Sequence, residues 1–275
     1  MVIAHCSELL TLDDPAFVHA VAIAARSGAA VRSLHVTRGL APEAAPPEAA
    51  SLLQRWGRPG GRLNHAWLLS ASTDDPADAL LEVIARVQPE LLVINTHARS
   101  GLARFFAGSV AEGIARNVAV PVLLLPSAGP GLVDAQSGAL TLTRALLLAG
   151  SREDTERAAR GLSVLTKLAA VEQCALELLH VEDTTPTPHA VLPAGFAVTQ
   201  HRAQGPLERA VAERVVQCPT DLIVMTSHGH DQLSDVVFSS HTERVLHEVR
   251  RPLLWVPALL AFERYFLATH RRGMV

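Results

Sequence analysis

The stretch NTHARSGLARFFAGS, residues 95–109, returns as TSHGHDQLSDVVFSS at residues 226–240, a shift of 131 positions. Each copy follows a short apolar run. Each leads through a helix-like stretch to a run between two prolines, PVLLLP at 121–126 and PLLWVP at 252–257, with the same shift. A repeat of this length predicts two copies of one structural unit.

Each copy reads as an apolar strand, a polar loop and a helix that begins at Ser109 or Ser240. Free amides and the helix dipole favour an anion at such a helix start, so both copies are candidate phosphate cradles. Both serines also stand three residues before a glutamate, Glu112 or Glu243, which is the capping-box pattern. A purely structural role as helix caps is therefore the alternative for both.

Short apolar runs alternate with amphipathic stretches along the whole chain. In the first half we expect strands at 2–5, 30–36, 63–69, 91–94 and 120–125, with helices at 15–25, 49–56, 76–87 and 110–117. In the second half we expect strands at 144–148, 175–181, 196–201, 222–225 and 253–256, with helices at 153–168, 206–216 and 242–249. The helix between the second and third strands is expected to be missing or reduced in the second half.

This order predicts an α/β protein of two repeated domains, each a five-stranded parallel sheet with helices on both faces. We expect domain 1 at residues 1–126, a linker at 127–141, domain 2 at 142–257 and a helical tail at 258–275. Ligands of parallel sheets bind at the carboxyl ends of the strands, where both repeated loops would lie.

Composition narrows the functional class. Of the 275 residues, 49% are hydrophobic and 19% charged, which suits folded cores and excludes disorder. A net charge of −3 gives no basic field, so nucleic acid is not an expected partner. We see no secretory signal, no membrane-spanning run and no disulfide or metal-type cysteine spacing, and we expect a cytoplasmic protein.

Further shared motifs link the chain to a family. The first strand of each half runs into a serine-containing turn, CSE at 6–8 and GSR at 150–152, and the second strand ends in LHV at 34–36 and 179–181. With the repeated loops, the chain resembles the universal stress protein superfamily, in its tandem two-domain form. The resemblance covers nearly the whole chain and implies an adenine nucleotide alpha hydrolase-like fold in each half.

Nucleotide-binding members of that superfamily carry the pattern Gly-x2-Gly-x9-Gly-Ser/Thr. In the first half this pattern falls on Asn95, Ala98, Gly108 and Ser109, and in the second on Thr226, Gly229, Ser239 and Ser240. Both copies have therefore lost glycines, and the first is better preserved. The family's acidic residue after the first strand is expected at the positions of His5 and Ala149.

The resemblance implies ATP as the candidate ligand of the first half. It points to these candidate contact positions: Val36, Arg99, Gly108, Ser109 and Val110 in the first half, and Gly229 and Ser240 in the second. Val36 is expected near the adenine, and Arg99 is a candidate to neutralise phosphate. The resemblance also implies that the halves associate through their last strands, and it leaves a homodimer and a protein partner open.

Other functions find less support in the sequence. A nucleotide-free interaction or scaffold protein of the stress-response type is the alternative, because both motifs are eroded. No Walker motif and no Gly-x-Ser-x-Gly elbow is present, so we assign no catalytic residue and do not expect an enzyme. His228 and His230 alone do not make a metal site, and we assign none.

Overall fold

The computed structural model describes residues 1–6, 11–37, 45–71, 75–96, 110–126, 129–181, 190–226, 244–246 and 248–257. The strands and helices of the first half are β1 (Val2–Cys6), α1 (Pro15–Ser27), β2 (Ala30–Thr37), α2 (Ala49–Arg55), β3 (His65–Ala71), α3 (Pro76–Val87), β4 (Leu91–Thr96), α4 (Val110–Asn117) and β5 (Val122–Pro126). Those of the second half are β6 (Arg144–Leu148), α5 (Arg152–Leu168), β7 (Cys174–Val181), β8 (Phe196–Ala203), α6 (Leu207–Gln217), β9 (Leu222–Thr226) and β10 (Leu253–Val256).

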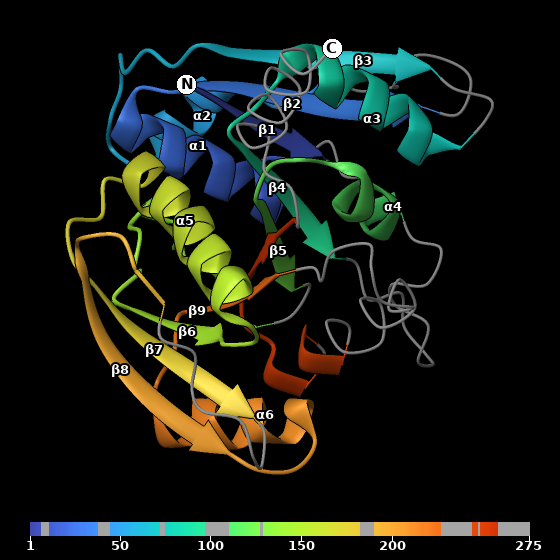
Figure 1. Cartoon of the computed structure of the whole chain (residues 1–275). Coiled ribbons are helices and arrows are strands. Elements are labelled where there is room, and N and C mark those ends of the chain that lie inside the picture. The colour runs from blue at the N-terminus through green and yellow to red at the C-terminus, as the bar shows by residue number, and fades with distance from the viewer. Residues whose placement is uncertain are drawn as a thin grey trace, which may run out of the picture.

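All ten strands form one continuous sheet in the order β3-β2-β1-β4-β5-β10-β9-β6-β7-β8 (Figure 1). Neighbouring strands within each half are parallel. The halves meet where β10 pairs antiparallel with β5. The predicted α/β fold with two repeated units is confirmed, and so is the expected association through the last strands.

Helices cover both faces of the sheet and divide its core into two clusters. On one face α1, α2 and α5 contribute Phe17, Leu52 and Leu162 to a cluster that runs through both halves. On the other face α3 and α4 of the first half and α6 of the second contribute to a second shared cluster. Burial of these apolar side chains is the main stabilising term of the fold, and both clusters tie the halves together.

Local chemistry sets where several elements begin. Asp14 and Asp75 cap α1 and α3, each accepting a hydrogen bond from a backbone N–H, and a proline follows each of them at the first turn. Strand β5 begins at Val122 rather than at the expected residue 120, because Pro121 has no N–H to donate to a neighbouring strand.

Residues 129–141, between the two halves, pack against the rest of the protein. Leu132 and Leu142 are buried in the core cluster that both halves share. Gly138 has a φ of +68°, and its Cα lies so close to the Trp56 ring that a Cβ would stand 2.4 Å from it. Arg26 at the end of α1 donates from Nε to the carbonyl of Ala169 at the end of α5, 2.6 Å away.

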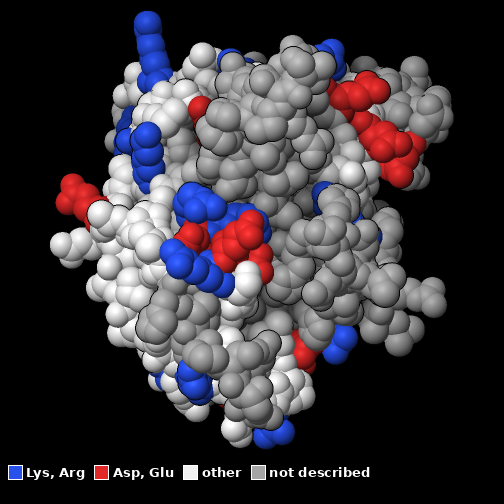
Figure 2. All heavy atoms as spheres, in the orientation of Figure 1, with Lys and Arg blue, Asp and Glu red and all other residues white. Residues whose placement is uncertain are grey.

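Charges on the face shown in Figure 2 are mixed in sign. Over the first turns of α5, Arg152 pairs with Glu156, and Arg157 pairs with both Glu153 and Asp154. Such pairs balance one another and create no extended field of one sign. No helix within the described ranges is long and apolar enough to cross a membrane.

Candidate functional site

The loops marked by the sequence follow β4 and β9, at the point where each half reverses its strand order. That reversal lies between β1 and β4 in the first half and between β6 and β9 in the second. Crevices at such reversals are the ligand sites of parallel sheets. Arg99, Gly108, Ser109, Gly229 and Ser240 lie outside the described residues, so their roles stay predictions.

Two predicted contact positions fall on described elements. Val36 is the next-to-last residue of β2, and Val110 is the first residue of α4. Both are half-buried and pack against the core cluster on the α3 and α4 face. The structure thus places both valines on one face of the sheet, beside apolar neighbours.

The end of β4 carries a polar atom without a partner. Thr96 donates its hydroxyl to the carbonyl of Leu125, 2.9 Å away, and so links β4 to β5. The side-chain oxygen of the preceding Asn95 is buried and accepts no hydrogen bond in the part of the chain that the structure describes. A buried acceptor of this kind is costly and is usually satisfied by a donor from protein, water or ligand.

His5 does not stand where the family comparison predicted an acidic residue. Its register partner on β2 is Ser33, so it lies within β1 rather than after it, and its side chain is buried. In the second half, the equivalent residue of β6 is Leu147 and not Ala149. His5 pairs with Val93 and Leu147 pairs with Val224, and Val93 and Val224 are themselves related by the repeat shift of 131 positions. The expected equivalence of His5 with Ala149 is therefore wrong.

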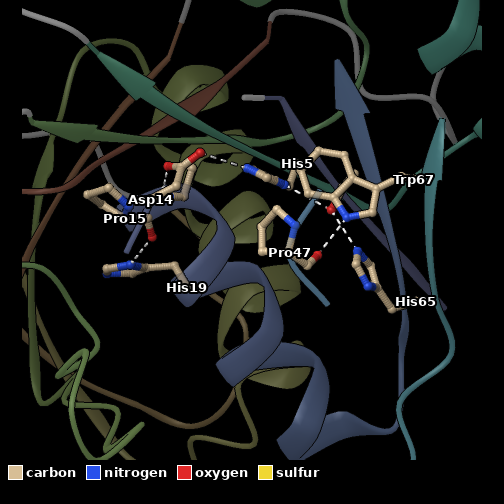
Figure 3. A network of polar contacts seen from close by, with 9 residues as sticks. His5, Asp14, Pro15, His19, Pro47, His65 and Trp67 are labelled. Carbon is tan, nitrogen blue, oxygen red and sulfur yellow. Dashed lines mark hydrogen bonds and ion pairs between the residues drawn. The ribbon is translucent and has the colours of Figure 1, made fainter. Parts of the chain in front are cut away.

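A buried chain of polar side chains runs across the first half (Figure 3). His5 contacts Asp14 through Nε2 at 3.2 Å and Ser33 through Nδ1 at 3.0 Å. The hydroxyl of Ser33 also lies 3.0 Å from Nε2 of His65, and Nδ1 of His65 accepts from the backbone N–H of Ala49 at 3.3 Å. His5, Ser33 and Asp14 are at most 1% exposed.

The backbone donor at one end fixes the tautomer of His65. Burial, with repulsion from His5 and Arg32, lowers the pKa of His65 to about 4, so its ring is neutral near pH 7. Because Nδ1 accepts from Ala49, the proton of a neutral His65 is on Nε2 and is donated to Ser33. At the other end the Asp14 carboxylate can only accept, so His5 donates to it from Nε2.

Asp14, His5 and Ser33 have the residue types of a hydrolase triad, but the chemistry does not follow. A nucleophilic serine must reach its substrate. Ser33 is 0% exposed and its oxygen is already shared by two histidines. The arrangement therefore holds protons in fixed positions between α1 and β3, and we call these four side chains, Asp14, His5, Ser33 and His65, the histidine relay.

Aromatic rings surround the histidine relay and lead to a cavity. Phe17 and Trp67 have ring centroids 5.3–5.9 Å from those of His5 and His65. Trp67 donates its indole N–H to the carbonyl of Pro47, 2.7 Å away. A cavity of about 520 Å³ opens between the start of α2 and the first residues of β3, with His65 and Trp67 in its wall.

A second buried histidine holds the segment that joins the halves. His19 of α1 donates from Nδ1 to the carbonyl of Pro15 at 2.7 Å. Its Nε2 accepts from the backbone N–H groups of Leu132 and Val133, at 2.9 and 3.2 Å. Burial lowers the pKa of His19 to about 4, which keeps the ring neutral and able to accept both bonds.

The other reactive side chains within the described ranges fit structural roles. Burial raises the pKa of the Cys6 thiol to about 12, which leaves almost no thiolate near pH 7. His180 is buried and lies 3.0 Å from the carbonyl of Ala149, as expected for a packed repeat residue. No group of three metal-ligating side chains converges among the residues that the structure describes.

The sequence missed the histidine relay because its members are scattered along the chain. Asp14 caps α1, and the other three come from β1, β2 and β3. One weak signal was available: Ser33 and His65 both interrupt apolar strands at positions that face the helices. A polar residue on the buried face of a strand needs a partner, but only the strand register shows which one.

The fold and these sites can be compared with known proteins. The model of the universal stress protein family matches residues 11–126 and 190–257, which is more than half of the chain. The protein therefore belongs to the universal stress protein family. Among curated proteins, none matches the chain in sequence.

Solved structures share the whole architecture. A universal stress protein from Archaeoglobus fulgidus superposes with a TM-score of 0.66 at 14% identity, covering 93% of this chain and 96% of its own. A Pseudomonas aeruginosa protein described as functionally unknown gives a TM-score of 0.66 at 12% identity, covering 98% of this chain and 97% of its own. Likeness at such identities shows the fold that these chains share.

Proposed function

We propose that this universal stress protein responds to an adenine nucleotide, with ATP as the ligand, through its first half. Gly108 and Ser109 would hold phosphate at the start of α4, and Arg99 would neutralise its charge. Val36 and Val110 would supply apolar contacts to the base. In the second half Gly229 and Ser240 would keep only part of this function, because Thr226 and Ser239 replace glycines.

The observation that carries this proposal is the strand order. The loop with Gly108 and Ser109 follows β4, which adjoins the reversal between β1 and β4. Asn95 supports the same position, because its buried side-chain oxygen lacks a donor there among the described residues. A ribose hydroxyl or an amino group is a donor of the required kind.

A nucleotide-free interaction protein is the second candidate, and one observation favours it. Residues 197–200 of the edge strand β8 are exposed. In the first half α2 covers this part of the fold, but the connection of residues 182–195 is much shorter than that of residues 38–64. An uncovered edge strand is a surface on which another protein can dock. A protein partner and a homodimer remain part of this second proposal.

The two proposals separate in a thermal unfolding experiment on the full chain. A ligand that binds only the folded state raises its melting temperature. At ATP concentrations about tenfold above Kd, we expect a rise of roughly 2–4 °C for a protein of this size. ADP and AMP are measured in parallel to learn which phosphates contribute.

A matched pair of variants locates the effect. Ser109→Ala should abolish most of the rise with ATP, and Ser240→Ala should leave it nearly unchanged. If no nucleotide shifts the melting temperature and mass spectrometry finds none released from denatured protein, the interaction proposal stands instead. An equal loss in both variants would contradict the assignment to the first half.

A further inference from the structure

The cavity beside the histidine relay lies apart from the predicted nucleotide loops. It borders His65, the first residue of β3, whereas those loops follow the carboxyl ends of β4 and β9. Parallel strands place their amino ends at the opposite edge of the sheet. A volume of about 520 Å³ is in the range of small-molecule sites.

The cavity wall combines aromatic, apolar and basic groups. Trp67, Leu63 and the imidazole of His65 provide flat or apolar surface, and Arg62 and Glu48 lie at the rim. Arg32 adds a second positive charge, because its field already lowers the pKa of the His65 ring. Two guanidinium groups against one carboxylate favour a ligand with a negative charge.

The polar groups behind the cavity are not required by the fold. The strand register places Leu147 and Leu178 of the second half at the positions of His5 and Ser33. It likewise places Val198 at the position of His65, because Val31 pairs with His65 and Leu176 with Val198. The second half thus builds the same strands with apolar residues. Buried polar networks are costly unless fully satisfied, so their presence in one half needs a separate reason.

We propose that this cavity binds a small aromatic carboxylate, with its ring against Trp67 and its anionic group at Arg62. The flat apolar wall accepts the ring. Arg62 provides the bidentate donor geometry that a carboxylate prefers. In the described part of the chain Arg62 has no ion pair, so its guanidinium is available to a ligand.

The histidine relay leaves no free N–H of His65 to the cavity. Nδ1 of His65 accepts from the backbone N–H of Ala49, and Nε2 donates to Ser33. The pKa of about 4 keeps this ring neutral between pH 6 and pH 8. The guanidinium of Arg62 therefore holds the anion, and affinity is expected to stay constant in this pH range.

Three probes of equal shape test the charge preference: benzoate, neutral benzamide and cationic benzamidine. Calorimetric titration of the full chain should show benzoate binding at least tenfold more tightly than either of the others. Its affinity should stay constant between pH 8 and pH 6, where the ring of His65 is neutral. Equal binding of the three probes would overturn the proposal. So would the absence of benzoate binding at roughly 10 mM, because a weaker Kd does not indicate a built site.

Two variants and a spectroscopic signal locate the site. Arg62→Gln should weaken benzoate binding about tenfold, because the ligand loses one charged hydrogen-bonding partner. Arg58→Gln, an exposed arginine of the same connection outside the cavity wall, should leave it unchanged.

The imidazole nitrogen shifts of His65 in the wild-type protein give the spectroscopic signal, and they should change on benzoate addition while staying in the range of the neutral ring. Competition between ATP and benzoate for one site, or an equal loss in both arginine variants, would refute a separate site at β3.

Discussion

The two halves of this protein share one strand order and differ in the side chains that they carry at the strand positions of the histidine relay. At register-equivalent positions the first half has His5, Ser33 and His65, and the second has Leu147, Leu178 and Val198. Packing against the helices is therefore compatible with either chemistry. The comparison teaches that the fold does not require polar groups at these positions.

The largest effect is expected when the histidine relay is cut at its centre. His5→Leu introduces the residue of the second half, but it removes one buried hydrogen-bond partner from Asp14 and one from Ser33. Unsatisfied buried groups of this kind cost about 1–3 kcal/mol each, so we expect the free energy of unfolding to fall by roughly 2–4 kcal/mol. Urea titration followed by circular dichroism measures this loss.

A double-mutant cycle sharpens the result. Ser33→Ala alone should also destabilise the protein, because it leaves nitrogens of both His5 and His65 unpaired. The double variant His5→Leu/Ser33→Ala should cost less than the sum of the two single variants, because it removes both partners of one bond. Strict additivity would mean that the two side chains do not interact as the structure indicates.

The fold was largely accessible from the sequence, and the histidine relay was not. Periodicity and turn residues predicted α4, β6 and β10 with the bounds that the structure has, because these segments are short apolar or amphipathic runs. By contrast, the contacts of His5 with Asp14 and Ser33, and of Ser33 with His65, depend on strand register. Register emerges only when the strands pair.

The second effect is the pH dependence of the free energy of unfolding that arises from His19 on α1. The pKa of His19 is lowered to about 4, below the ordinary 6.5, so the folded state binds fewer protons than the unfolded chain between these values. The contribution of the neutral ring is therefore complete above pH 6.5 and is lost as the pH falls towards 4. Between pH 7 and pH 5 we expect His19 to account for a loss of about 2 kcal/mol.

Comparison with a variant isolates this contribution, because His65 titrates in the same direction. His19→Gln keeps an acceptor for the N–H of Leu132 but has no group that titrates in this range. Its free energy of unfolding should therefore fall less than that of the wild type between pH 7 and pH 5. Equal losses in the two proteins would show that His19 does not stay neutral in the folded state.

The smallest effect is expected at the register equivalent of His65. Val198 on β8 is 41% exposed, so Val198→Thr should change the free energy of unfolding by less than about 0.5 kcal/mol. Its buried register partner Leu176 provides the contrast, because Leu176→Ala should cost about 2–5 kcal/mol. A substantial loss for Val198→Thr in thermal unfolding would indicate that another molecule or segment covers β8 in solution.

The antiparallel contact between β5 and β10 has a consequence for how such a protein diverges. In a dimer of identical chains, every substitution near the two-fold axis meets its own copy and must be tolerated twice. A single polypeptide that contains both subunits escapes this doubling, since Leu123 faces Leu254 and neither is bound to mirror the other. Two halves within one chain can therefore diverge in the chemistry of their strands while they keep the same pairing at β5 and β10.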